Sequence, residues 1–378
     1  MSAIFFYGSL RDHALLEIVL GRSVDPSDLE PARAEGFATL RLADEVYPML
    51  LPAPGAQADG VLLHRATEAD LDRLAFFEEA EYDLASITVT TAEGACDARY
   101  FRGTSKPTAS TEKWDFAAWC DHRAVAIEAA REYMHHYGRL PVEEIDTIWP
   151  GIKIRAYQRA RALESEPKLG AVRTAFGPDD VEQSLIRGYT SFLAVQELKL
   201  RHRRFDGGWT GELDRSVVAW GDAVTVLPYD PERDRVLLIE QFRPAPLARG
   251  DRNPWCIEVI AGRIDAAESP ELTARREAVE EAGVTLGRIA EIAGYYATPG
   301  LACEHLTGFV GEAELAGSGG VHGLAEEGED IRAMALGFDE ALAAIETGAV
   351  NTGPALISIL WLAANRRRLR NEWRRVGG

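Results

Sequence analysis

The sequence has few cysteines, and they lie far apart. Its four cysteines form no CxxC pair; they are Cys96, Cys120, Cys256 and Cys303. Disulfide frameworks and structural zinc sites need numerous or closely spaced cysteines, so this spread argues against both and favours a reducing, cytoplasmic location. The N-terminus also lacks the basic segment, apolar stretch and small-residue cleavage site of a secretory signal.

Long apolar runs and an excess of basic residues are absent too. No run approaches the roughly 20 apolar residues that span a bilayer, so no membrane-spanning segment is expected. Acidic residues outnumber basic residues by 60 to 41, which gives a formal net charge of −19. A surface with that charge repels polyanions and argues against extended binding to nucleic acid. A small-molecule enzyme or a small-molecule binding protein remains.

The composition that is present is that of an ordinary globular protein, neither disordered nor fibrous. The chain has 378 residues, 46% of them hydrophobic and 27% charged, and at roughly 150 residues per domain this length predicts two domains. Residues 164–180 contain two prolines and two glycines without periodicity, so we interpret them as a linker. We therefore expect a first domain over 1–110, a helical extension over 111–163 and a second domain over 181–378.

Short strands and turns alternate early in the chain, and helical patterns follow. The elements expected there are strands over 4–7, 58–64 and 87–90 and a helix over 68–77. Residues 112–137 are rich in Ala and Glu and predict one long helix, and a further helix is expected over 152–163. The apolar runs 223–228 and 235–239 predict a β-hairpin. The arginines of 366–370 are interpreted as a solvated helix end.

The strongest signal in the chain is a glutamate-rich motif that begins at Gly262. Its pattern is G-x5-E-x7-R-E-U-x-E-E-x-G-U, where U is apolar, and residues 262–284 fill every specified position. A helix over 268–282 is expected, because the composition is helix-forming, Pro270 lies in its first turn and Gly283 is a natural stop.

Three glutamates of this motif share one face of the expected helix. Glu277, Glu280 and Glu281 are spaced i, i+3 and i+4, which places them about 5–6 Å apart. Like charges destabilise a bare helix at this spacing, whereas a shared Mg²⁺ or Mn²⁺ would remove the conflict. Arg276 is positioned to orient Glu268. Taken alone, the glutamates are more typical of a solvated acidic face than of a metal site, but the register of the whole motif favours the metal site.

This motif resembles the Nudix box, the signature of enzymes that hydrolyse a nucleoside diphosphate linked to another group. The flanking segments narrow the resemblance: 235–243 reads RVLLIEQFR, 253–262 reads NPWCIEVIAG and 297–300 reads ATPG. From about Tyr189 to the C-terminus, the chain is similar to the bacterial ADP-ribose diphosphatase branch of that family. The resemblance implies an α/β/α sandwich, a homodimer, and Mg²⁺-dependent hydrolysis of ADP-ribose to AMP and ribose 5-phosphate.

The resemblance also implies the roles of individual residues. The positions that match metal ligands are Ala261, through its carbonyl, Glu277, Glu281 and Glu329. Glu280 lies beside them, and Glu327 matches the loop glutamate that activates the attacking water. The positions that match substrate contacts are Arg215 and Arg243 for the diphosphate, Phe192 for adenine, and Thr298, Gly300 and Glu304, which the family supplies from the partner subunit. Trp220 stands where relatives carry arginine.

Alternatives to this assignment stay open. Taken singly, Arg243 is typical of a surface, Phe192 of a core and Glu327 of a solvated loop, so that only their common register assigns them to a site. The substrate could instead be another nucleoside diphosphate derivative. The domain could also be a non-catalytic ADP-ribose sensor, although a complete set of glutamates argues against this.

A second resemblance covers about residues 3–102. A YGSL tetrapeptide directly follows a strand, at Tyr7, Gly8, Ser9 and Leu10, and Glu78 comes later after an apolar run. Their order is similar to the γ-glutamylcyclotransferase-like fold, a small mixed β-barrel. Together with the Nudix resemblance, this implies a two-domain protein of the α+β class. The resemblance implies that the YGSL amides hold a carboxylate and that Glu78 is the acid/base group.

For this first domain too, other interpretations stay open. The tetrapeptide alone is typical of an ordinary strand exit, and Glu79 replaces the glycine that usually follows the acid/base glutamate. A binding or dimer-stabilising role is therefore the alternative to cyclotransferase activity. Proteins with this fused architecture also carry a tellurite-resistance label, for which the sequence offers no chemistry.

Overall fold

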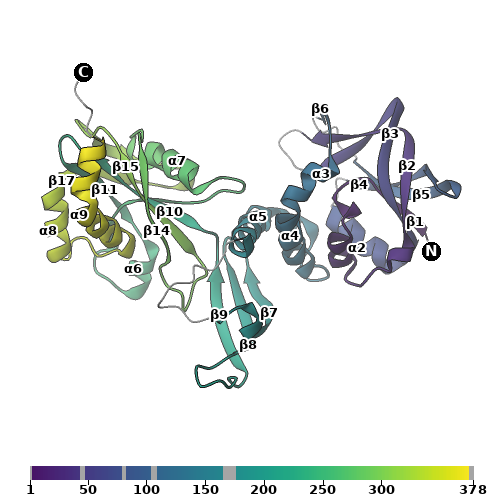
Figure 1. Ribbon diagram of the computed structural model, residues 1–378, viewed down its shortest axis with the longest axis horizontal. Helices are drawn as coiled ribbons and strands as arrows, with labels where there is room; N and C mark the ends of the chain where they lie inside the picture. The colour runs from purple at the N-terminus through teal and green to yellow at the C-terminus, as the bar shows by residue number, and fades with distance from the viewer. Residues whose placement is uncertain (1, 43–46, 79–81, 104–108, 165–175, 374–378) are drawn as a thin grey trace. The chain divides into compact units, whose positions relative to one another are not determined.

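The computed structural model divides the chain into two compact units. Unit 1 covers Met1–Lys168 and unit 2 covers Leu169–Gly378 (Figure 1). The structure describes residues 2–42, 47–78, 82–103, 109–164 and 176–373, so most of the predicted linker over 164–180 lies outside the described residues. Across the described ranges, no helix is long and apolar enough to cross a membrane.

Unit 1 is built on a closed barrel of five strands. These are β1 (Ser2–Phe6), β2 (Leu29–Leu42), β3 (Pro48–Ala66), β4 (Tyr82–Thr91) and β5 (Gly94–Gly103). The order β3-β1-β5-β4-β2 closes through a pairing of β2 with β3, and β6 (Ala109–Lys113) adds to β2. The β1–β5 pair is parallel and the other pairs are antiparallel. The expected small mixed β-barrel is therefore confirmed.

The helices of unit 1 differ in part from those expected. They are α1 (His13–Leu20), α2 (Glu68–Glu78), α3 (Phe116–Trp119), α4 (Arg123–His135) and α5 (Val142–Glu164). The single helix predicted over 112–137 is wrong, because β6 runs to Lys113 and Asp115 then starts α3 by accepting the N–H of Ala117. Helix α5 begins ten residues before the predicted 152–163 and passes through Pro150.

Helices α4 and α5 belong to the core of unit 1. Tyr133 is 2% exposed, and Ile145 and Ile152 are fully buried in one cluster with residues of β1 and α1. Arg155 on α5 binds Glu132 on α4 at 2.7 Å, and both side chains are almost fully buried. Because their apolar faces complete the core and their charges are paired, these helices fold as one body with the barrel.

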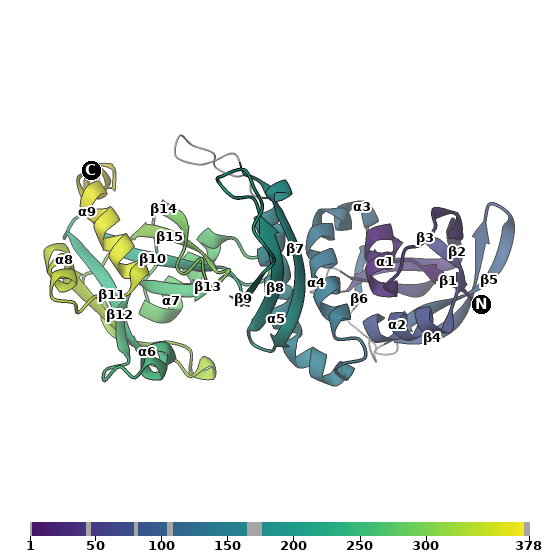
Figure 2. The same ribbon diagram turned by 90° about the horizontal axis from the view of Figure 1, so that it is seen from below.

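Unit 2 contains a small sheet and a large mixed sheet. The small antiparallel sheet is formed by β7 (Val181–Thr190), β8 (Ala194–His202) and β9 (Leu213–Ala219), which run side by side in Figure 2. The large sheet is formed by β10 (Ala223–Asp230), β11 (Arg235–Phe242), β12 (Trp255–Glu258), β13 (Ile260–Arg263), β14 (Ile289–Tyr296), β15 (His305–Glu312), β16 (Gly319–His322) and β17 (Ile331–Gly337). Its main order is β14-β15-β10-β11-β17-β16, and the β10–β15 pair is parallel.

Helices cover both faces of the large sheet. Residues of β10 alternate between faces: Val226 packs in the core with α7 (Pro270–Ala282), and Leu227 packs in the core with α8 (Phe338–Glu346) and α9 (Gly353–Trp373) (Figure 1). A short helix, α6 (Pro244–Arg249), connects β11 to β12. The expected α/β/α arrangement is therefore confirmed.

Strands β10 and β11 pair at their turn and then separate. The paired residues are Tyr229 with Val236 and Asp230 with Arg235, which confirms the predicted hairpin. Beyond the turn, β12 pairs with β11 and β13 pairs with β10. This arrangement places Gly262 of β13 opposite Val224 and against α7, which carries the glutamates of the motif.

Two arginines of the predicted solvated helix end, Arg366 and Arg370, are ion-paired and largely buried. The Nε atom of Arg366 and the Nη1 atom of Arg370 each lie 2.8 Å from a carboxylate oxygen of Asp234, in the β10–β11 turn. The hydroxyl of Tyr229 donates to the same carboxylate at 2.8 Å. Together these contacts lower the pKa of Asp234 despite its partial burial, which acts in the opposite direction. Asp234 thus fixes the end of α9 to the sheet.

We expect Asp234→Asn to lower the free energy of unfolding of unit 2 by about 2 kcal/mol, because it weakens several hydrogen bonds to a charged group. Asparagine tolerates the positive φ of 58° at this position, so backbone strain does not enter. Urea denaturation followed by tryptophan fluorescence measures the change. The control is Asp339→Asn. Asp339 is another ion-pair partner of Arg366, but the side chain of Asp339 is 83% exposed. Equal effects of the two substitutions would contradict the prediction.

Candidate active site

The glutamate motif folds as predicted from the sequence. Helix α7 begins after Ser269, whose hydroxyl accepts the N–H of Leu272, and it ends at Gly283 in the left-handed conformation with φ of 63°. Pro270 occupies the first position of the helix. These caps fix the register of the helix, and therefore which side chains face the sheet.

Two glutamates of α7 lie against β13. Glu281 is 2% exposed, and its Oε2 atom accepts the N–H of Ala261 at 3.1 Å. Glu277 lies directly over Gly262, where an added methyl group would stand 1.9 Å from its Oε1 atom. The contact seen at Ala261 is through its amide, and its carbonyl as a metal ligand stays a prediction. Glycine at 262 is required for this approach of helix and strand.

Arg276 holds three of the carboxylates of the motif. Its Nη2 atom lies 3.1 Å from Glu268, which confirms the predicted orienting contact. Its Nη1 atom also lies 2.8 Å from Glu277 and 2.8 Å from Glu280, a bridging role that the sequence analysis did not predict. The guanidinium therefore offsets part of the repulsion between the glutamates.

Burial sets the protonation of this glutamate pair. It raises the pKa of Glu281 to about 8 and that of Glu277 to about 7, and the charge of nearby Glu329 acts in the same direction. Glu329 itself accepts the N–H of Leu324 at 3.0 Å. Within the described parts of the chain, no three His, Cys, Asp or Glu side chains already enclose a space suited to a metal ion. The charge of Glu329 thus acts on both Glu277 and Glu281.

The residue predicted to activate water and the two arginines predicted to bind the diphosphate differ in their exposure to solvent. Glu327 is exposed at the end of the one-turn helix Ala325–Glu327, two residues before Glu329. Arg243 binds Glu258 at 2.7 Å, and its charge opposes the rise in the pKa of Glu281 that burial causes. Arg215 is exposed on β9, where it donates to the carbonyl of its neighbour. Arg243 therefore lies near the glutamates, whereas Arg215 projects from the small sheet.

Arg263, on the strand that carries Gly262, lies against a pair of aromatic rings. The guanidinium carbon of Arg263 is 5.1 Å from the ring centre of Phe192 and 5.8 Å from that of Trp220. The two rings meet edge to face, and Phe192 is 62% exposed in the turn between β7 and β8. Arg263 was missed by the sequence analysis, because its position in the motif accepts any residue.

The predicted partner-facing residues lie in the loop between β14 and β15. The carbonyl of Thr298 accepts the N–H of Leu301, and Gly300 is exposed between them. Glu304 accepts the indole N–H of Trp220 at 2.7 Å, and burial raises its pKa. This loop therefore contacts its own unit, and its contact with a partner subunit stays a prediction.

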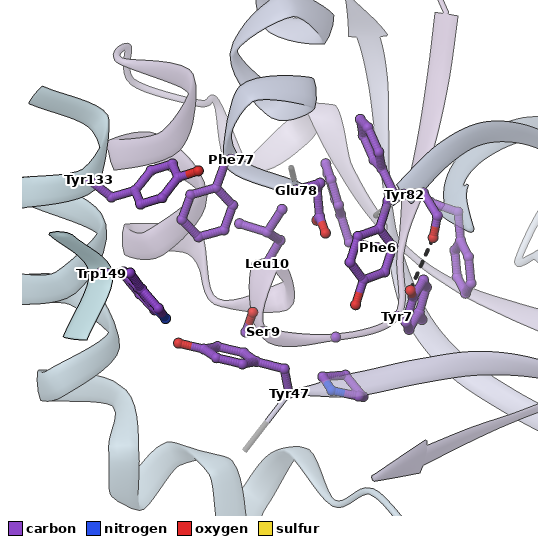
Figure 3. Close-up of a pocket in the computed structure, with 14 residues that line it drawn as sticks. Phe6, Tyr7, Ser9, Leu10, Tyr47, Phe77, Glu78, Tyr82, Tyr133 and Trp149 are labelled. Atoms are coloured by element: carbon purple, nitrogen blue, oxygen red, sulfur yellow. Dashed lines mark hydrogen bonds between the residues drawn. The ribbon is translucent and has the colours of Figure 1, made fainter. Parts of the chain in front are cut away.

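Unit 1 has a separate candidate site. A cavity of about 230 Å³ is lined by the YGSL turn, from Tyr7 to Leu10, and by Glu78 at the end of α2 (Figure 3). The hydroxyl of Tyr7 donates to the carbonyl of Phe101 at 3.0 Å. The structure thus brings together the residues predicted for this domain, although Glu79 lies outside the described residues.

Comparison with known proteins places unit 2 in a family. Residues 219–344 match the family described as NUDIX domain. An ADP-ribose pyrophosphatase of Escherichia coli (strain K12) is 38% identical over 202 residues, which are 52% of this chain and 95% of that protein. The chain belongs to the Nudix family. A second relative, the ADP-ribose pyrophosphatase of Haemophilus influenzae, is 35% identical over 51% of this chain and 89% of its own length.

Other comparisons extend this result. A GDP-mannose pyrophosphatase of Enterobacter sp. (strain 638) is 36% identical over 151 residues, which are 39% of this chain and 76% of that protein. Residues 4–120 match the family described as Gamma-glutamyl cyclotransferase, AIG2-like. The chain is therefore a fusion of a domain of that kind with a Nudix hydrolase domain.

We expect Gly262→Ala to reduce the hydrolase activity of the Nudix domain by about 100-fold, because a catalytic side chain displaced by ~1 Å can cost that much. The added methyl group would overlap the Glu277 carboxylate and push it from β13. Steady-state rates with ADP-ribose and Mg²⁺ measure the effect. Gly211→Ala is the control, because a methyl group there meets no atom within 4 Å. Similar rates for the two variants would show that the Glu277 position is unimportant.

Proposed function

We propose that the Nudix domain hydrolyses ADP-ribose to AMP and ribose 5-phosphate in the presence of Mg²⁺, with Mn²⁺ as a substitute. The observation that carries this proposal is that the half-buried Glu277 and the buried Glu281 of α7 lie against Gly262 and Ala261. The 38% identity to an ADP-ribose pyrophosphatase over 95% of that protein's length supports the choice of substrate.

The residues at this site fit a hard divalent cation. Their donors are carboxylate oxygens, and two of these carboxyl groups have raised pKa values because they are buried beside a third acid, Glu329. The residues proposed to hold the metal are the Ala261 carbonyl, Glu277, Glu281 and Glu329, with Glu280 beside them. When bound, the metal supplies positive charge that offsets the diphosphate and polarises a phosphoryl oxygen.

The chain's own residues are proposed to perform the hydrolysis. Glu327 takes a proton from water, the water oxygen bonds to one phosphorus, and the bond from that phosphorus to the bridging oxygen breaks. Arg243 and Arg215 bind the negative diphosphate oxygens. Phe192 and Arg263 contact the adenine ring by stacking. We also propose a homodimer, in which the loop residues Thr298, Gly300 and Glu304 contact the substrate of the neighbouring subunit. Light scattering of the purified chain would detect the dimer through its molar mass.

The substrate is tested by direct comparison. With Mg²⁺, we expect kcat/KM for ADP-ribose to exceed that for GDP-mannose by at least about 10-fold, because sugar and base contacts discriminate on that scale. EDTA is expected to abolish the reaction and added Mg²⁺ to restore it. Faster hydrolysis of GDP-mannose would show that GDP-mannose, and not ADP-ribose, is the preferred substrate of the Nudix domain. Saturable binding of ADP-ribose without release of AMP would identify a sensor.

A second activity is proposed for unit 1 because one cavity contains both the YGSL turn and Glu78. In this reaction, the α-amine of a γ-glutamyl amide attacks its own γ-carbonyl and displaces the amine as 5-oxoproline forms, with Glu78 transferring the proton. The assay is release of 5-oxoproline from a γ-glutamyl dipeptide. We expect it in the wild type and not in Glu78→Gln; its absence from both would leave a binding or dimer-stabilising role.

A further inference from the structure

Trp220 lies in the short connection between the two sheets of unit 2. Strand β9 ends at Ala219 and β10 begins at Ala223 (Figure 1). The indole N–H of Trp220 donates to the Oε1 atom of Glu304 at 2.7 Å, in the loop that leads into β15. The roles that the Nudix resemblance implies do not include Trp220, so this contact has no assigned function.

The backbone on both sides of Glu304 is held by the same part of the fold. The N–H of Cys303 donates to the carbonyl of Val218 at 3.0 Å, and the N–H of His305 lies 3.4 Å from a carboxylate oxygen of Asp222. Because the main chain is fixed before and after Glu304, the bond from the indole N–H sets the direction of the carboxylate.

The indole ring of Trp220 is itself held in place. It meets the ring of Phe192 edge to face with the ring centres 5.8 Å apart, and the guanidinium carbon of Arg263 lies 5.8 Å from its centre. Phe192 and Arg263 are the residues proposed to stack on adenine. The ring of Trp220 therefore links the proposed base position to Glu304, and Trp220 can act on the substrate through Glu304 without touching the substrate.

The donor in this pair is neutral, so it leaves the charge of the carboxylate uncompensated. Burial raises the pKa of Glu304, the hydrogen bond from Trp220 lowers it, and the negative charge of Asp222 raises it further. A half-buried carboxylate in this setting is stabilised by additional hydrogen-bond donors and repels negative groups. A ribose presents suitable donors, because it carries hydroxyl groups on neighbouring carbons.

We propose that Trp220 is a positioning residue, which holds the Glu304 carboxylate so that it accepts a hydrogen bond from a ribose hydroxyl of the substrate. The inference rests on the proposed hydrolysis of ADP-ribose, and both riboses of that molecule offer such hydroxyls. It applies equally to a substrate bound in the same subunit and to one bound in the neighbouring subunit, because Trp220 and Glu304 belong to one unit.

Substrates that lack one hydroxyl test the contact. The four analogues of ADP-ribose are each without the 2- or the 3-hydroxyl of either the adenosine ribose or the terminal ribose. We expect at least one analogue to show kcat/KM reduced about 10-fold or more, because an acceptor in the site is then left without its donor. The analogue affected identifies the ribose that Glu304 binds. Equal kcat/KM for ADP-ribose and all four analogues would overturn the proposal.

Trp220→Phe keeps an aromatic ring and removes the N–H donor. We expect KM for ADP-ribose to rise about 10-fold with little change in kcat, because a contact made in binding is weakened. The preference for ADP-ribose over the affected analogue is expected to shrink, which a purely structural role would not cause. An unchanged preference would overturn the proposal.

Two further variants control for indirect effects. In a Glu304→Ala background, Trp220→Phe is expected to change KM by less than about twofold, because residues that act through one contact are not additive. Trp209→Phe makes the same substitution at a tryptophan that packs against Arg201 and Arg203, and we expect wild-type kinetics from it. Thermal unfolding of each variant reports whether unit 2 remains folded. Equal effects of Trp220→Phe in the wild-type and Glu304→Ala backgrounds would contradict action through Glu304.

Binding without turnover separates this proposal from the proposed hydrolysis. Titration calorimetry of the full chain in EDTA measures the affinity for ADP-ribose when the metal is removed. We expect Trp220→Phe to weaken this affinity about 10-fold and Trp209→Phe to leave it unchanged. A wild type that binds ADP-ribose but releases no AMP with Mg²⁺ would reject the hydrolysis alone, and weaker binding by Trp220→Phe would still support the positioning role. Equal affinities of wild type and Trp220→Phe would overturn that role.

Discussion

Replacement of Glu281 by glutamine is expected to reduce ADP-ribose hydrolysis by about 100- to 1000-fold, the cost of removing a group that acts on transition-state charge. Glutamine has nearly the same shape, and its amide oxygen can still accept the N–H of Ala261. The contact that anchors α7 to β13 is therefore preserved, while the negative charge proposed to hold the metal is lost. Release of AMP under saturating ADP-ribose and Mg²⁺ measures the effect on kcat.

The matched control for Glu281→Gln is a glutamate on another face of the same helix. Glu271 is an exposed residue at the start of α7, and it pairs with Arg275 at the surface. Glu271→Gln removes the same charge from the same helix, and we expect its rate to stay within about twofold of wild type, because exposed ion pairs contribute little. A Glu281→Gln variant that retains wild-type rates would remove Glu281 from the proposed chemistry.

Metal-free protein is expected to lose stability in unit 2 as the pH rises from about 5 to 8. The pKa values of Glu277 and Glu281 are about 7 and about 8 in the fold, against an ordinary value of 4.5. The folded chain therefore retains protons that the unfolded chain has released, so its free energy of unfolding falls across this window. Because one pKa unit corresponds to about 1.36 kcal/mol and the two groups titrate as a coupled pair, we expect a loss of several kcal/mol.

Denaturant titrations in EDTA at several pH values would measure this dependence through the unfolding of unit 2. Glu281→Gln is expected to flatten the curve, and to be more stable than wild type at pH 8 even though it is inactive. Added Mg²⁺ is expected to stabilise the wild type more at pH 8 than at pH 6, because protons compete with metal for carboxylates. Stability that rises with pH in the metal-free wild type would contradict the burial of these groups as neutral, protonated acids.

The parts of the site that could be predicted from the sequence depend on local rules. Ser269, Pro270 and Gly283 bound α7 through capping and backbone preferences, which involve only neighbouring residues. The alternation of β10 likewise follows from apolar residues that face two layers. The need for Gly262 was visible as a motif position, and the structure adds the reason, which is the overlap with Glu277.

Contacts between distant segments could not be predicted in this way. Residues 112–137 have helical composition, yet β6 takes their first residues through pairing with β2, and Asp115 then starts a new helix. Nothing local indicates that Tyr133 meets Phe77 or that Arg263 meets Phe192, because these pairs form only when the chain has folded. The bridging role of Arg276 needed the relative directions of three side chains.

Because α4 and α5 are buried in the core of unit 1, the segment that folds as one body is longer than the segment that matches the cyclotransferase family. A recombination event at residue 120, where the family resemblance stops, would leave Ile145, Ile152 and the Arg155–Glu132 pair on the wrong side of the junction. The smallest segment that can move between genes with its cavity complete therefore runs through the end of α5 at Glu164. Two residues that line the cavity, Tyr133 and Trp149, lie in this helical segment.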